Sequence, residues 1–104
     1  MYFKEVFICV CEVSKITIEE LEKRAIHRSG IDLYNLEDAM LLIKLCQQES
    51  LPILGIDAFK ICGEKIQPSM ENSIDLSFEK ESYHIAMRFL TDRCNLKFLY
   101  EIVY

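Results

Sequence analysis

Cysteine and histidine are the residues of this sequence whose chemistry is easiest to judge from spacing. Cys9 and Cys11 lie two positions apart, so on a strand both thiols would point to one side, as in some metal sites. A tetrahedral zinc site needs further ligands at regular spacing, and neither His27, His84 nor the other cysteines supply them. Buried cysteines commonly act as small apolar side chains. We therefore expect no metal site and no cofactor.

Asp57 is a second candidate because it lies within an apolar run, residues 51–59, in which Gly55 lets the backbone pass close to a neighbour. The run is typical of a buried strand, where a carboxylate needs a partner. Asp57 could be catalytic, ligate a metal or bind a protein, or it could accept hydrogen bonds that fix a loop. No second catalytic group accompanies it, and no histidine lies in a motif with a nucleophile and an orienting acid. We expect a protein that is not an enzyme.

Two stretches are rich in carboxylates. Residues 71–82 carry four of them against Lys80 alone, and residues 32–49 carry four against Lys44 alone. Such stretches are either a solvated surface, with some carboxylates at helix starts, or a negative patch for a basic protein. The formal net charge of −5 argues against a nucleic-acid binder, which needs clustered Lys and Arg.

The elements that position these residues are predicted from hydrophobic period and residue type. With 104 residues, 51% of them hydrophobic, the chain is expected to form one domain over residues 1–104. A helical period predicts helices at 17–28, 35–50 and 77–95, the last of which begins at Ser77 or Glu79. Aromatic and β-branched residues indicate strands at 2–13, 53–61 and 96–104, with a helix as the alternative for the first of these. In the last strand, alternation places Lys97 and Glu101 on one face and, on the other, Leu96, Phe98, Tyr100, Ile102 and Tyr104. We expect an α+β layer fold, with a mixed or antiparallel sheet packed against about three helices.

Local signals mark the ends of these elements. Thr17 and Glu20 form a capping box, Ser29-Gly30 suits the end of the first helix, and Asn35 is a predicted N-cap of the second. Residues 62–65 resemble a turn, after which Ile66 begins a short return strand. The polar residues 67–77 are expected to form an exposed loop with a brief strand at 74–76.

The first residues of the chain also bear on its compartment. Residues 1–13 lack a basic start, a continuous apolar centre and a small-residue cleavage site, so we expect no signal peptide. No run approaches the roughly 20 apolar residues of a membrane span. Five cysteines without framework spacing indicate reduced thiols. We expect a cytoplasmic protein without a membrane or nucleic-acid partner.

An ordered series of motifs resembles the immunity protein forty family of bacterial polymorphic-toxin systems. The resemblance covers roughly the chain from Ser29 onward. Its motifs are the turn Ser29-Gly30-Ile31, a helix with Asp38-Ala39-Met40, the run Ile53-Leu54-Gly55-Ile56-Asp57-Ala58-Phe59, a variable loop, a helix containing Ala86, and the closing Tyr100-Glu101-Ile102-Val103-Tyr104.

The resemblance implies a non-enzymatic protein that binds and silences a cognate toxin, which is expected to be basic, by covering its active site with an acidic surface. Charge complementarity would speed the encounter, and a few apolar anchors would slow release. The acidic part is expected at Asp57, Glu71, Asp75 and Glu79, with Phe78 as an apolar anchor.

A different class of function remains open from the sequence. Residues 2–13 are apolar on both faces of the expected strand, and Phe98-Leu99-Tyr100 gives an aromatic edge. Such strands can pair between subunits. The alternative is therefore a small homo-oligomeric scaffold or regulatory interaction domain, and an immunity protein could itself be a homodimer.

Overall fold

The computed structural model describes residues 16–104, which form three helices, five strands and two antiparallel sheets. The predicted α+β class is thus confirmed for this part of the chain. The predicted strand at 2–13, the doubly apolar surface on it and the Cys9-x-Cys11 pair lie outside the described residues. The elements in chain order are α2 (Ile18–Glu22), β1 (Ile26–Arg28), β2 (Ile31–Leu33), α3 (Leu36–Gln48), β3 (Gly55–Cys62), β4 (Lys65–Asp75), α4 (Ser82–Thr91) and β5 (Leu99–Val103).

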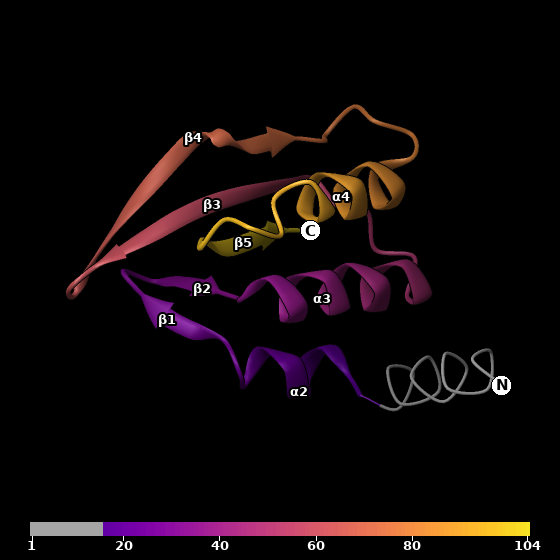
Figure 1. Ribbon diagram of the computed structural model, residues 1–104. Coiled ribbons are helices and arrows are strands. Elements are labelled where there is room, and N and C mark those ends of the chain that lie inside the picture. Colours follow the sequence, from indigo (N-terminus) through magenta and orange to yellow (C-terminus); the bar gives the residue numbers. More distant parts are fainter. Residues whose placement is uncertain (1–15) are drawn as a thin grey trace, which may run out of the picture.

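The larger sheet has β3 at its centre, between β4 and β5, and both neighbours run antiparallel to it. Figure 1 shows the long β3–β4 hairpin, which turns at Gly63 and Glu64. Gly63 has a φ of 66°, which glycine adopts without steric cost. The edge of β5 is extended by Tyr34, whose backbone N–H and C=O each lie 2.8 Å from their partners on Tyr100.

The first predicted helix is wrong beyond its first turns. Thr17 caps α2 as expected, accepting a hydrogen bond from the Glu20 backbone at 3.1 Å, but the helix ends at Glu22. Residues 26–33 instead form the β1–β2 hairpin. Ser29 and Gly30 both have positive φ, 53° and 77°, as a two-residue type I′ turn requires. A turn is present at Ser29-Gly30, as predicted, but it connects the two strands of a hairpin and does not end a helix.

The predicted loop at 67–77 is also wrong, because residues 65–75 form the strand β4. Its polar side chains suggested solvent, and most of them are indeed exposed, but its backbone pairs with β3. Pro68, which cannot donate to a ladder, is tolerated because β4 has β3 as its neighbour on one side of this three-stranded sheet and lies at its edge. A polar pattern therefore describes an edge strand here.

The second predicted helix is confirmed as α3. The Asn35 side chain accepts a hydrogen bond from the Asp38 backbone at 2.8 Å, as an N-cap should. At the other end Ser50 adopts a φ of 58°, and the Leu51 N–H donates to the Cys46 carbonyl at 2.8 Å. This is the hydrogen bond of a Schellman C-cap, made here by a residue other than glycine.

The third helix, α4, begins at Ser82, later than the predicted 77 or 79. Residues 76–79 are used in a turn, in which the Glu79 N–H donates to the Leu76 carbonyl. The closing strand β5 is shorter than the predicted 96–104, but the prediction of its faces is confirmed. Tyr100 and Ile102 are buried, and Glu101 points to the other side.

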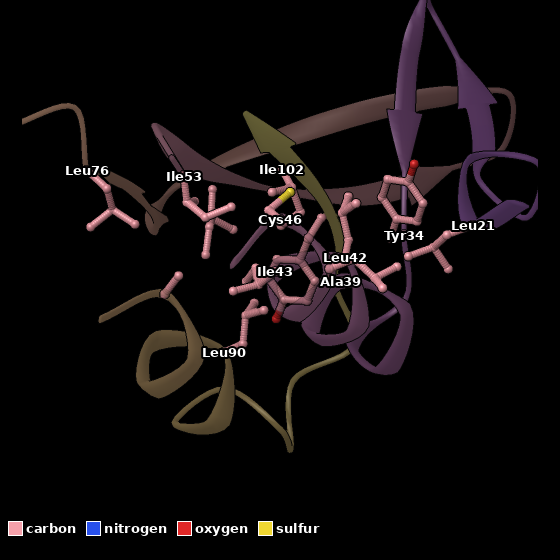
Figure 2. Close-up of a cluster of buried hydrophobic side chains, with 14 of the residues drawn as sticks. Leu21, Tyr34, Ala39, Leu42, Ile43, Cys46, Ile53, Leu76, Leu90 and Ile102 are labelled. Carbon is pink, nitrogen blue, oxygen red and sulfur yellow. The ribbon is translucent and has the colours of Figure 1, made fainter. Parts of the chain in front are cut away.

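The core lies between the helices and one face of the larger sheet. That face contributes Ile56 and Ala58 from β3 and Tyr100 and Ile102 from β5, all of them buried. Figure 2 shows these strands beside the inward side chains of α3 and α4. The helical side of the core comprises Leu21 on α2, Ala39, Leu42, Ile43, Leu45 and Cys46 on α3, and Ala86 and Leu90 on α4. In Figure 1, α3 lies between α2 and α4.

Candidate protein-binding site

The opposite face of the larger sheet carries a shallow groove. Alternation along the strands places Gly55, Asp57, Glu101 and Val103 on this face, and Asp57 pairs directly across from Glu101. The groove has a volume of about 390 Å³. Its lining is mostly apolar, contains two carboxylates and no cation, and consists of Leu54, Gly55, Asp57, Met70, Ser73, Ile74, Asp75, Ser77 and Val103.

Gly55 forms the floor of the groove and allows a close approach of β4, as its position in the sequence predicted. A Cβ atom placed on Gly55 would lie 3.1 Å from the Ile74 carbonyl oxygen. That contact is shorter than side chains normally tolerate, so glycine keeps the two strands close at this point. The absence of a side chain also leaves the groove open between Leu54 and Asp57.

A bulge of several residues in β4 forms one wall of the groove. Ile56 pairs with Ile74 and Ala58 pairs with Ser69, so the single residue Asp57 faces four residues of β4, 70–73. Bulges of this kind bend a strand and re-aim its side chains, and they are common beside functional sites. Here the bulge turns Met70 outward, leaving it 81% exposed.

The bulge is held in place by side-chain hydrogen bonds. Ser73 Oγ accepts from the Ala58 N–H at 3.0 Å and donates to the Ser69 carbonyl at 2.8 Å. Asn72 Nδ2 donates to Ser69 Oγ at 3.0 Å. From the end of α4, Arg93 Nε donates to Asn72 Oδ1 at 3.2 Å, while its guanidinium lies 3.6 Å from the centre of the Phe89 ring. The wall of the groove is therefore built in advance of any partner.

Carboxylates continue from the groove around the edge of the sheet. Glu101, Asp32 and Glu22 line a second hollow of about 220 Å³ together with Tyr34 and Tyr104. Burial raises the pKa of the Glu101 carboxyl, and the nearby charges of Asp57 and Asp32 raise it further. We call the five residues Glu22, Asp32, Asp57, Asp75 and Glu101 the acidic belt.

The belt has little neutralising charge of its own. The ion pairs within residues 16–104 are Arg24 with Asp38 and His27 with Asp32, and the second of these reaches one residue of the belt. The Asp57 carboxylate receives no hydrogen bond from a side chain or backbone in the described part of the chain, so the loop-fixing role considered for it has no donor there. Burial is the main cause of the raised pKa of Glu101, and the unpaired charges of Asp57 and Asp32 add to it.

Asp75 has a structural role as well as a place in the groove. Its Oδ1 accepts from the Ser77 N–H at 2.9 Å and from the Ser77 hydroxyl at 2.6 Å. Both hydrogen bonds lower the pKa of this carboxyl. Asp75 therefore stays charged and is fixed in direction at the point where β4 ends.

The structure brings some of the predicted binding residues together and not others. Asp57 and Asp75 line one groove, and Glu71 is exposed on the bulge beside Met70. Phe78 and Glu79 are also exposed, Phe78 at 96%, but neither lines the groove. They lie on the loop between β4 and α4, two residues or fewer beyond Ser77 at the groove's end.

Several residues of the site were missed by sequence reasoning. No sequence pattern indicates Met70 or Arg93, because the bulge and the hydrogen bonds that hold it depend on how β3 and β4 pair. Glu101 was placed correctly on the outer face of its strand but was not connected to Asp57. The register of β3 with β5, which puts them directly opposite, is the information that was lacking.

Within 16–104, no cluster of three histidine, cysteine or acidic side chains has metal-binding geometry. Cys46 is buried, which raises the pKa of its thiol to about 11, whereas Cys62 and Cys94 are exposed and lie apart from the groove lining. Over the same residues, no helix is long and apolar enough to cross a membrane.

Comparison of this chain with protein-family models, with curated proteins and with solved structures finds no match.

Proposed function

We propose that this protein is a non-enzymatic immunity protein, which binds a cognate bacterial toxin in the cytoplasm and neutralises it by covering the toxin's active site. The observation that carries the proposal is the meeting of Asp57 and Asp75, 18 positions apart in the sequence, in one groove beside the exposed Met70. Carboxylates that surround apolar side chains suit a protein partner, because charge guides the encounter and apolar contact slows release.

The charge distribution supports a basic partner. The acidic belt carries five carboxylates along one edge and face of the sheet, and the net charge of the chain is −5. Toxins that act on nucleic acids, or on other anionic substrates, need a positively charged active site. A belt of this kind would compete with such a substrate for the same positive side chains, so occlusion and charge matching would act together.

The motifs that resemble the immunity family lie on the elements that build the site. The run from Ile53 to Phe59 supplies the groove floor and Asp57, and the run from Tyr100 to Tyr104 supplies Glu101 and Val103. The Ser29-Gly30 turn places Asp32 at the second hollow. The resemblance and the geometry therefore point to the same surface, although they rest on different observations.

The test is capture of the partner followed by neutralisation. Tagged protein is used to capture partners from the native source at low and at high salt, and the toxin domain identified by mass spectrometry is then co-expressed with this protein in a sensitive host. We expect survival with the wild-type protein, and loss of survival with the double variant Asp57→Lys, Glu101→Lys. We expect the affinity of this variant for the toxin to fall by at least about tenfold, mainly through slower association.

A matched variant separates charge at the site from charge in general. Glu49→Lys with Glu64→Lys reverses the same number of exposed carboxylates away from the groove and should keep the host alive. Glu71→Lys with Glu79→Lys tests the two predicted residues outside the groove lining. Equal affinity of the site variant and the matched variant would contradict the proposal, as would self-association with no toxin captured at either salt concentration.

A further inference from the structure

The groove has a shape and a charge pattern that restrict what it can hold. Its lining combines the carboxylates of Asp57 and Asp75 with the apolar side chains of Leu54, Met70 and Val103. These three are exposed by 39%, 81% and 37%, so they offer a contact area that the fold itself does not use. None of the residues lining the groove is a cation.

The bulge places the side chain of Met70 where a partner can contact it. Ser73 and Asn72 are tied into the network that ends at Arg93, so residue 70 is presented outward from a fixed backbone. A flexible methionine would lose side-chain freedom on binding, but its backbone is already ordered here. Preorganisation of this kind favours binding because less entropy is lost when the partner arrives.

We propose that this groove is a docking site for an extended basic segment of a partner protein. In this arrangement an aliphatic side chain of the segment contacts Leu54, Met70 and Val103, and Lys or Arg side chains on either side of it reach Asp57 and Asp75. The inference rests on the proposed function, since it requires a protein partner. It deepens that function by stating which kind of segment of the partner binds in the groove.

The charge of the occupant follows from the carboxylates. An acidic segment would be repelled by Asp57 and Asp75, whereas each Lys or Arg would be attracted, since no cation in the groove lining offsets these two charges. The extended form follows from the groove's position along the strands, because alternate side chains of a strand-like segment point to one side. A segment of the form Lys-Xaa-Val-Xaa-Lys therefore presents one Val and two flanking Lys side chains to the groove on the same side.

The experiment titrates the ¹⁵N-labelled full chain with acetyl-Lys-Ser-Val-Ser-Lys-amide, the Lys–Val peptide, and follows backbone amide shifts. We expect saturable shifts at Gly55, Asp57, Ser73, Asp75 and Val103. Acetyl-Lys-Ser-Ser-Ser-Lys-amide keeps the charge without the aliphatic side chain and should bind about fivefold more weakly. Acetyl-Glu-Ser-Val-Ser-Glu-amide should cause no saturable shift in the groove.

Variants assign the binding to these side chains. Met70→Ser should weaken the Lys–Val peptide by about fivefold, and Asp57→Asn with Asp75→Asn by a similar factor. Glu64→Gln, at the far turn of the β3–β4 hairpin, removes one carboxylate away from the groove and should leave affinity unchanged. All three variants alter exposed or half-buried side chains, so unchanged spectra elsewhere will show that the fold is retained.

The outcomes are distinct from those of the neutralisation test. Absence of saturable shifts in the groove, or equal binding of the acidic peptide, would overturn the docking site even if a toxin is neutralised. Concentration-dependent shifts of the same amides without peptide would identify a second copy of the chain as the occupant and would also overturn it. Peptide binding in the groove without any toxin capture would support the docking site and contradict the proposed function.

Discussion

The two faces of the larger sheet are made by the same three strands but have opposite roles. On the inner face Ile56 and Ile102 pair across β3 and β5, and both are buried against the helices. One position along each strand, Asp57 and Glu101 pair on the outer face and remain partly exposed, with like charges opposite each other. Like charges directly opposite on a sheet are destabilising. The outer face therefore contains an arrangement that folding alone does not favour, which is expected of a surface that binds something.

The largest expected difference between the faces comes from truncating neighbours on β3. Ile56→Ala removes a fully buried side chain from the core and should lower the free energy of unfolding by about 2–5 kcal/mol. Asp57→Ala, the next residue, should change it by less than about 0.5 kcal/mol. Urea unfolding of the two variants measures both values. If Asp57→Ala were the more destabilising substitution, the assignment of the faces would be incorrect.

The bulge is connected to the core strand by one hydrogen bond. The backbone N–H of Ala58, whose side chain is buried in the core, donates to the hydroxyl of Ser73, which lines the groove. Ser73→Ala would leave this half-buried N–H, and the Ser69 carbonyl, without their partner. We expect a loss of about 1–2 kcal/mol in the free energy of unfolding. Hydrogen exchange of the Ser73→Ala variant should show a larger increase in rate over the wild-type protein at the Ala58 amide than at the Ile56 amide. Unchanged exchange at Ala58 would show that the bulge is held without this hydrogen bond.

The inner face contains one polar atom that its surroundings do not satisfy. Tyr100 is fully buried, and its hydroxyl has no hydrogen-bond partner among the described residues. Burial also raises the pKa of this phenol, while the charge of Arg93 opposes the shift. Tyr100→Phe removes the hydroxyl and keeps the ring, so we expect the free energy of unfolding to rise by up to about 1 kcal/mol. Thermal unfolding measures this, and a clear loss of stability would mean that the hydroxyl has a partner after all.

The elements predicted correctly from the sequence are those whose signals agree at several levels. For α3 the period of Leu36 to Cys46, the Asn35 cap and the nearby Pro52 all indicate the same helix, and the structure confirms it. The Ser29-Gly30 pair, by contrast, fits both a helix end and a type I′ turn. The choice between them depends on the contacts of β2 with β5, which no local pattern contains.

The groove was only partly predictable for a related reason. Cys62 pairs with Lys65, so an unbroken hairpin would place Asn72 opposite Gly55. The bulge shifts the register by three residues, and Asp75 lies opposite Gly55 instead. Asp57 and Asp75 could be named as binding residues from their charge and context, but their meeting in one groove depends on this irregularity. The polar network of Ser73, Asn72 and Arg93 that fixes it comes from two separate elements.

The smallest expected effect is a dependence of stability on pH that comes from the outer face alone. The Glu101 carboxyl has a raised pKa in the folded protein, so the folded state holds this proton more tightly than the unfolded chain, where glutamate titrates near pH 4.3. Below that pH the group is neutral in both states and contributes no penalty. As pH rises through the folded-state pKa, ionisation of this partly buried carboxyl, which also lies beside Asp57 and Asp32, lowers the stability of the wild-type protein.

Glu101→Gln should therefore match the wild-type protein near pH 3 and exceed it at pH 7, by about 0.2–1 kcal/mol, the range found for exposed charge pairs. Urea unfolding at both pH values measures the difference, with Glu64→Gln as the control for loss of one carboxylate outside the belt. The same substitution should weaken binding of the basic peptide, because it removes one of the charges that attract it. The single charge of Glu101 would then oppose folding and favour binding, whereas the side chains of the inner face stabilise the fold. Lower stability of the variant at pH 7 would contradict the charge penalty on folding, and unchanged peptide affinity would remove Glu101 from the binding surface.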